Sequence, residues 1–177
     1  MSRILIITGS PRRNGNTDRL AQSFAKGAEE SNQVEIVSVN DYKVNPCIGC
    51  NSCYMSEGNK CFQNDDMETI YEKLSKTDIL IIASPVYFYG ISSQLKAIID
   101  RLHNPLRNSS KIKKLGLILV GADTIPELFD SIITQYKLVL NYFKLDDAGM
   151  VLVRGAIEKG DVKEKDLKKA YELGVSL

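Results

Sequence analysis

The sequence predicts a doubly wound α/β domain, in which helices cover both faces of a parallel sheet. Four short apolar runs are continuous rather than alternating, at 4–8, 79–84, 115–122 and 150–153. Continuous apolar runs are typical of strands that are covered on both faces. Segments whose apolar residues recur at helical spacing lie between these runs. The length of 177 residues is that of one domain with a substantial core, so we predict a single domain over 1–177.

The first half of the chain supplies two strands and two helices. The strand at 4–8 precedes a helical pattern over 20–31. The segment 34–39 keeps polar residues among its apolar ones, which predicts an edge strand. Two aspartates followed by Met and Glu open a predicted helix at 65–75, with Asp65 and Asp66 as expected caps.

The second half continues the alternation. The strand at 79–84 is followed by a helical pattern over 91–102, and the strand at 115–122 by one over 125–136. A last strand at 150–153 and a helix at 163–173 complete the predicted order. With strands numbered along the chain, the expected sheet order is 2-1-3-4-5, which places the loops after strands 1 and 3 beside one crevice.

Charge and hydropathy exclude several classes of partner. The chain has 23 basic and 22 acidic residues, so nothing in its charge predicts binding to nucleic acid or to an anionic membrane. The apolar run at 4–8 is far shorter than a signal sequence or a membrane span. We therefore expect a cytoplasmic protein, in which disulfides are uncommon.

The loop after the first strand, TGSPRRNGNTDRL, has the composition of an anion site. Two glycines permit a sharp turn, and Ser10, Asn16 and Thr17 lie where the N–H groups and dipole of the next helix favour an anion. Arg12 adds bidentate donors. The alternative is an ordinary polar turn.

The spacing of this loop is not that of the two commonest nucleotide loops. It lacks the first glycine and the lysine of GxxxxGK[ST], and it also lacks GxGxxG. A single phosphate, such as that of FMN, suits the loop better than a triphosphate or a dinucleotide.

The loop after the third strand, SPVYFYGISSQ, is aromatic. Pro85 stiffens it, Val86, Tyr87 and Phe88 crowd the carboxyl edge of the sheet, and Gly90 is expected to open the next helix. Such a patch suits a flat ring system. The alternative is that these residues cap the core.

All four cysteines lie in the long irregular stretch 40–64, with the spacing C-x2-C-x2-C-x7-C. The first three resemble the start of a ferredoxin cluster motif, whereas zinc sites more often use two separated pairs. Three interpretations stay open, namely an iron–sulfur cluster, free or redox-sensitive thiols, and zinc. The cysteines are Cys47, Cys50, Cys53 and Cys61.

Together, GSPRRNGNT, CIGCNSC, the DDM after it and SPVYFYGISSQLKAIIDR resemble the NADPH-dependent FMN reductase family, and most closely its iron–sulfur flavoprotein branch. The resemblance covers nearly the whole chain. It implies a flavodoxin-like three-layer sandwich with a five-stranded parallel sheet that binds FMN without a covalent bond. It also implies a [4Fe–4S] cluster on the cysteine loop.

The resemblance assigns roles to individual residues. Those expected to hold the FMN phosphate or shape its loop are Ser10, Arg12, Asn14, Asn16 and Thr17. Those expected to line the isoalloxazine are Pro85, Val86, Tyr87, Phe88 and Gly90, with Gly121 and Ala122 as weaker contacts after the fourth strand. No side chain need be catalytic, because the flavin accepts the hydride of NAD(P)H.

The function implied is an FMN-dependent NAD(P)H oxidoreductase that passes electrons to a small-molecule or protein acceptor. The alternatives are a flavodoxin-like electron carrier that does not use NAD(P)H, and a redox sensor that signals through its cysteines. Members of the family are commonly homodimers, so at least a dimer is expected. His103 is interpreted as a helix cap, and Asp100 and Arg101 as helix or dimer contacts.

Overall fold

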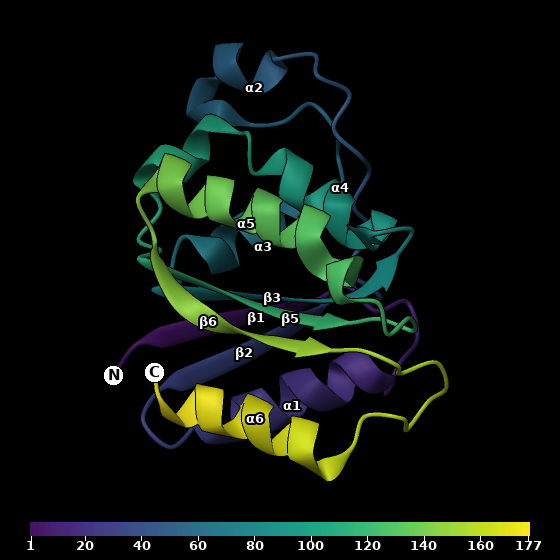
Figure 1. Cartoon of the computed structure of the whole chain (residues 1–177). Coiled ribbons are helices and arrows are strands. Elements are labelled where there is room, and N and C mark those ends of the chain that lie inside the picture. Colours follow the sequence, from purple (N-terminus) through teal and green to yellow (C-terminus); the bar gives the residue numbers. More distant parts are fainter.

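The protein is a three-layer α/β/α sandwich around a twisted sheet (Figure 1). The computed structural model describes all residues, 1–177. Five parallel strands run in the order β2-β1-β3-β5-β6, which confirms the order expected from the sequence. Their bounds are β1 Arg3–Thr8, β2 Gln33–Ser38, β3 Ile79–Tyr87, β5 Lys114–Val120 and β6 Asp146–Val153.

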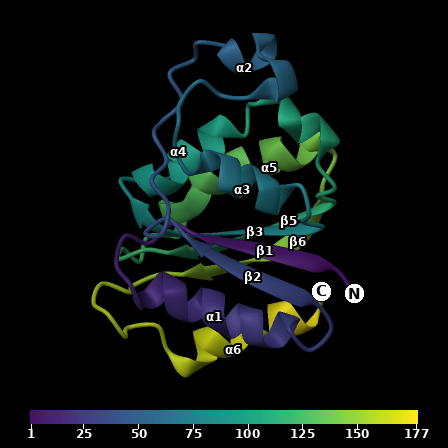
Figure 2. The same ribbon diagram turned by 180° about the vertical axis from the view of Figure 1, so that it is seen from behind.

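Helices cover both faces of the sheet, as Figures 1 and 2 show. One face carries α1 (Asn16–Ala28) and α6 (Glu164–Val175). The other carries α3 (Met67–Leu74), α4 (Ser93–Arg101) and α5 (Asp130–Phe143). Four short helical turns complete the chain, namely α2 (Ser52–Met55), η1 (Glu57–Asn59), η2 (Pro105–Ser109) and η3 (Pro126–Phe129). No helix has both the length and the apolarity that crossing a bilayer needs.

The continuous apolar strands divide their side chains between two cores. In β1, Ile4 and Ile6 pack toward α1, whereas Leu5 and Ile7 pack toward the opposite layer, and all four are buried. Period-two alternation therefore sends apolar side chains to both faces, which explains the unbroken runs. By contrast, the edge strand β2 leaves Ile36 43% exposed.

Two segments differ from the sequence prediction. Gly90 does not open a helix, because Gly90–Ile91 forms a short strand, β4, paired antiparallel with the end of β3. The next helix begins at Ser93, where the Ser92 side chain accepts the backbone N–H of Leu95. The last strand begins at Asp146 rather than at 150, because backbone pairing with β5 continues past an irregularity between Leu115 and Leu117.

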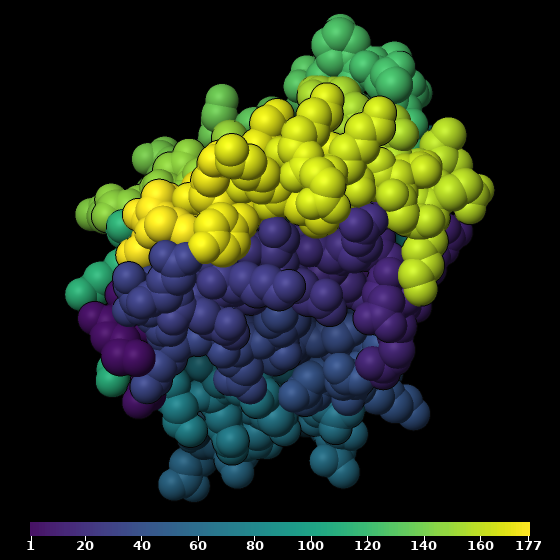
Figure 3. Space-filling view, turned by 90° about the horizontal axis from the view of Figure 1, so that it is seen from below, coloured from purple at the N-terminus to yellow at the C-terminus, as the bar shows by residue number.

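Helices α1 and α6 touch backbone to backbone, and Figure 3 shows the C-terminal helix lying along α1. A Cβ added to Gly27 would lie 2.1 Å from the carbonyl oxygen of Tyr171. A Cβ added to Gly174 would lie 2.2 Å from that of Phe24. Glycine at both positions is therefore what allows this close approach.

Replacing Gly27 with Ala should separate the two helices. We expect G27A to lower the free energy of unfolding by about 1–3 kcal/mol, the usual cost of overpacking. Lys26→Ala, one position earlier on the exposed side of α1, is the matched control and should change stability little. Urea denaturation measures both, and equal stability of the two variants would contradict this account of the packing.

Candidate functional site

The loops after β1, β3 and β5 meet at the carboxyl edge of the sheet, which is where parallel α/β sheets bind ligands. Gly9 donates its backbone N–H to the carbonyl oxygen of Ala83 at 2.7 Å, which joins the first of these loops to β3. A Cβ on Gly9 would lie 2.8 Å from both Leu95 Cβ and Ser92 Oγ. The first loop can therefore lie against the start of α4 only if this residue is glycine.

Ser10 is fixed inside the first loop. It is 4% exposed, and its hydroxyl donates to the carbonyl oxygen of Arg12 while accepting the N–H of the same residue. The carbonyl oxygen of Ser10 accepts a hydrogen bond from Asn40 Nδ2 at 2.7 Å. Sequence reasoning missed Asn40, since nothing in the sequence shows that it returns to this loop.

The start of α1 is free of side-chain caps. Gly15 occupies the N-cap position, and no side chain accepts a hydrogen bond from the first turn. Asn14 adopts a left-handed φ of 55° and donates its N–H to Asp18 Oδ2 at 2.7 Å. A helix N-terminus that its own side chains do not cap favours an external anion.

Asn16, which was predicted to contact the phosphate, and Arg13 in the same loop both have partners within the chain. The Asn16 side chain donates to the carbonyl oxygen of Glu158 and accepts the N–H of Gly160, so it anchors the segment before α6. Arg13 forms an exposed ion pair with Asp41 at 2.6 Å. Arg12 is exposed and forms no salt bridge, which leaves its guanidinium available to an anion.

Beneath the loop the Thr8 hydroxyl and the Asp18 carboxylate lie together, and neither Thr8 Oγ1 nor Asp18 Oδ1 has a partner elsewhere in the chain. Burial raises the pKa of Asp18, and the hydrogen bond from the Asn14 N–H opposes this rise. Buried polar atoms in proteins are normally paired, and here the Thr8 hydroxyl lies against the Asp18 carboxylate and also opposes the rise in its pKa. Sequence reasoning missed both residues, because Thr8 reads as the end of a strand and Asp18 as a helix residue.

The third-strand loop is a tight β-hairpin. Val86 pairs with Ile91 and Tyr87 with Gly90, so Phe88 and Tyr89 form the two-residue turn. Both have positive φ, 48° and 61°, which is strained for aromatic residues and is found preferentially at functional sites. The hydroxyl of Ser131 donates to the carbonyl oxygen of Tyr89 and so ties the turn to α5.

The hairpin residues predicted to line the ring system differ in their exposure to solvent. Pro85 and Val86 are partly buried at the carboxyl end of β3, whereas Tyr87 is 45% exposed and Phe88 fully exposed at the tip. Ser84 is fully buried, and its hydroxyl accepts the N–H of Ser92, which fixes the hairpin to α4.

The loop after β5 completes this edge. Gly121 donates its N–H to the carbonyl oxygen of Val153, and a Cβ there would lie 2.5 Å from Leu128 Cδ2. Ala122 is exposed beside it. The edge thus combines an uncapped helix, a free arginine and an aromatic hairpin, a set that fits a phosphate joined to a flat ring.

The cysteine loop leaves this edge and closes at a neck, where Lys43 and Asn45 are hydrogen-bonded to Asp66 and Asp65. Lys43 and Asp66 pair through two hydrogen bonds, from each backbone N–H to the other residue. Asp65 accepts the N–H of Asn45 and pairs with Arg101 at 2.5 Å, with both side chains almost fully buried. Burial alone would raise the pKa of Asp65, but hydrogen bonds from Asn45, Arg101 and Met67 outweigh it and lower that pKa.

This neck revises two interpretations made from the sequence. Asp66 does not cap α3, because its carboxylate accepts the Lys43 N–H instead. Arg101 is a buried partner of Asp65 rather than a surface contact. The pair spans 36 residues, so local sequence carries no signal of it.

The tip of the loop rests on the segment after α4. Asn104 donates to the carbonyl oxygen of Asn59, and the Tyr54 hydroxyl contacts His103. His103 is therefore a docking contact of the loop, not only a helix-end residue. The tip meets the end of α4 whereas the first and third loops meet its start, so at about 1.5 Å per residue the two regions are separated by roughly 13 Å of helix.

The four cysteines are free thiols on this loop, two exposed and two partly buried. Burial raises the pKa of Cys53, and the neighbouring Cys61, Cys47 and Cys50 add to the rise, so the four are near enough to interact. A hydrogen bond from Ser52 lowers the pKa of the exposed Cys50. No three metal-ligating side chains are arranged as a ligand set. The number and type of donors fit an iron–sulfur cluster, whereas their arrangement here is not that of a bound metal.

The sequence is similar to those of known flavoproteins. Over 174 residues, which is 95% of this chain and 75% of the relative, the sequence is 35% identical to an iron–sulfur flavoprotein of Archaeoglobus fulgidus. It is 42% identical over 123 residues to an iron–sulfur flavoprotein of Methanocaldococcus jannaschii, a match that covers 68% of this chain but only 62% of that relative.

A solved structure shares the fold. The NAD(P)H:quinone oxidoreductase of Methanothermobacter marburgensis superposes with a TM-score of 0.77 over 99% of this chain and 96% of its own, at 15% identity. The model of the NADPH-dependent FMN reductase family matches residues 2–145, which include the first loop, the cysteine loop and the hairpin. The chain therefore belongs to the NADPH-dependent FMN reductase family.

Proposed function

We propose that the protein is an FMN-dependent NAD(P)H oxidoreductase that passes electrons from bound FMN to a second acceptor. The observation that carries this proposal is the uncapped N-terminus of α1 facing the edge occupied by the hairpin. Family membership supports FMN as the cofactor and NAD(P)H as the electron donor. The nature of the acceptor, small molecule or protein, is part of the proposal.

The chain's own residues would bind and orient the cofactor. The first turn of α1, with Ser10, Arg12 and Thr17, would hold the phosphate, and the backbone of Asn14 would shape the loop. Pro85, Val86 and Gly90 would lie against the ring system. When bound, FMN supplies the capacity to accept a hydride and to release electrons singly or in pairs.

We further propose that Cys47, Cys50, Cys53 and Cys61 hold a [4Fe–4S] cluster. The names of relatives at 35% and 42% identity support this, as does the four-thiol donor set on one loop. In a cluster-bearing protein the neck at Asp65 and Arg101 would keep the thiols within one closed loop.

A homodimer in the cytoplasm is proposed as the working form. The chain belongs to the NADPH-dependent FMN reductase family, whose members are commonly homodimers, and this membership supports the dimer. Free cysteines suit a reducing compartment.

The first experiment is an anaerobic absorbance spectrum followed by NAD(P)H oxidation with an artificial acceptor. Flavin absorbance and steady NAD(P)H consumption would support the oxidoreductase. Flavin without consumption would favour the electron carrier. Absence of flavin after FMN is added would refute the proposal.

Arg12 and Arg13 offer a matched test of the phosphate site. Loss of hydrogen bonds to a charged group costs about 1.5–3 kcal/mol, so R12A should weaken FMN binding roughly 10- to 100-fold. R13A removes only the exposed pair with Asp41 and should have a small effect. Riboflavin has no phosphate, so its affinity should be the same for both variants. Fluorescence titration measures all four combinations, and equal losses for FMN and riboflavin would contradict the assignment of Arg12.

Replacing all four cysteines with Ser should abolish the iron and sulfide of anaerobically purified protein, which we expect at about four irons per chain. FMN affinity should be retained, because the cysteine tip and the flavin edge lie at opposite ends of α4. Iron and sulfide assays with flavin titration provide the measurement. Iron-free wild-type protein would instead leave the loop as free thiols or a redox sensor.

Asp65→Asn tests the neck of the loop. Removing one partner of a buried ion pair costs about 3–5 kcal/mol, so D65N should be strongly destabilised in urea. Asp100→Asn, which removes the exposed pair with Lys96 on α4, is the control and should cost far less.

The same pair predicts a dependence on pH. The folded-state pKa of Asp65 is lowered, so its contribution to stability is present above the unfolded value of about 3.9 and is lost as pH falls through the lower folded value. The wild type should lose this contribution below about pH 4, and D65N should lack that part of the acid dependence. Identical acid profiles would contradict the role given to the pair.

A further inference from the structure

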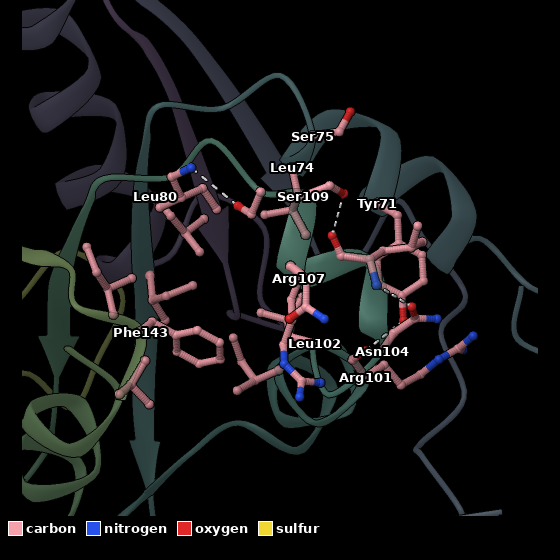
Figure 4. A pocket seen from close by; sticks show the side chains of 18 of the residues that line it. Tyr71, Leu74, Ser75, Leu80, Arg101, Leu102, Asn104, Arg107, Ser109 and Phe143 are labelled. Carbon is pink, nitrogen blue, oxygen red and sulfur yellow. Dashed lines mark hydrogen bonds between the residues drawn. The ribbon is translucent and has the colours of Figure 1, made fainter. Parts of the chain in front are cut away.

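A cavity of about 800 Å³ lies between the sheet and the layer of α3, α4 and α5 (Figure 4). Its floor is formed by β3 and β5, through Leu80, Ile82, Leu115 and Leu117. Helices α3, α4 and α5 form the walls, and the segments around η1 and η2 cover it. The cavity is therefore lined by several elements and is open to solvent on one side.

The cavity is separate from the flavin edge. Leu80 and Leu115 lie near the amino ends of β3 and β5, whereas the candidate flavin loops follow the carboxyl ends. None of the residues proposed to hold FMN lines the cavity. Ile91, which follows Gly90 in the chain, is the lining residue next to them in sequence. A ligand here would not compete with the flavin for space.

The lining is mostly apolar and includes four aromatic rings, those of Tyr71, Tyr136, Tyr142 and Phe143. Water is a poor occupant of apolar cavities. Pockets that bind small molecules measure roughly 300–1,000 Å³ and have mainly apolar walls, and this cavity is within that range.

The charges at the rim favour an anion. Arg107 and Lys144 line the cavity and form no salt bridge, whereas Lys60 is paired with Glu68. Among the lining carboxylates only Glu72 is without an ion-pair partner. The Arg107 guanidinium donates to the Tyr54 hydroxyl and the His103 carbonyl oxygen, and it retains further N–H donors.

We propose that this cavity is a second ligand site, which binds an apolar aromatic compound carrying an anionic group. The ring system occupies the space over β3 and β5, and the anion lies at the rim near Arg107 and Lys144. The cysteine loop supplies part of the cover through Gly58 to Cys61. The proposal does not depend on the oxidoreductase activity, because the cavity lies away from the flavin edge.

The test uses FMN-saturated protein and two probes with the same rings. One is 1-anilinonaphthalene-8-sulfonate, and the other is N-phenyl-1-naphthylamine, which has no charge. We expect saturable fluorescence enhancement with both and roughly tenfold tighter binding of the sulfonate, the ratio that corresponds to one charge-assisted contact. Absence of binding by either probe would overturn the proposal, and equal affinities would overturn its anionic part.

Two neighbouring residues of α5 provide matched variants. Val139 lines the cavity, whereas Leu138 is 64% exposed and does not. V139W should place an indole inside the cavity and reduce probe binding at least tenfold, while L138W should leave it unchanged. The chain has no tryptophan, so indole emission also reports whether the new side chain is buried in V139W and exposed in L138W.

Leu117→Phe, which enlarges a side chain on the floor, repeats the test from the sheet if V139W fails to fold. Undiminished probe binding in either folded variant would overturn the proposal. Gel filtration accompanies each variant. Dissociation of an oligomer by V139W but not by L138W would show that a second copy covers the cavity, and this also would overturn the proposal.

Discussion

The close contact of Gly9 with the start of α4 is the interaction on which both the candidate flavin edge and the cysteine loop depend. With no Cβ, Gly9 lies against Ser92 and Leu95 while its N–H bonds to β3. Ser92 in turn caps α4 and donates its N–H to Ser84. The start of α4 is therefore fixed to the flavin edge, and the direction of the helix follows from that contact. At its other end Arg101 reaches the neck of the cysteine loop.

The strained turn of the hairpin is held in place by its contacts with neighbouring elements. Phe88 and Tyr89 hold positive φ values that cost of order 1–3 kcal/mol each. Pairing of Val86 with Ile91 and the bond from Ser131 to the Tyr89 carbonyl oxygen oppose relaxation of the turn. A two-residue turn normally uses Asn or Gly at these positions. Aromatic side chains here present rings at the edge of the crevice, which is a functional reason for accepting the strain.

Much of the fold and the position of the two flavin loops could be predicted from the sequence, because strand runs and helical spacing are local signals. The order of the sheet followed from those signals and from general rules of topology. The hairpin was not predicted, since Gly90 after aromatic residues also suits a helix start. The path of the cysteine loop was not predicted either. Cysteine spacing indicates a donor set, but only distant contacts such as Asp65 with Arg101 and Asn59 with Asn104 determine where that set lies.

The distance between cysteines and flavin edge changes how the loop should be interpreted. An origin directly after β2 suggests that the thiols lie beside the crevice, and Asn40 does begin there, bonded to Ser10. The neck then carries the chain along the helical layer, and the tip docks beyond α4. Because α4 is the shared element, the structure of the loop is coupled to the flavin edge through the position of one helix. The thiols themselves are chemically separate from that edge within one chain, and this separation makes their roles experimentally distinguishable.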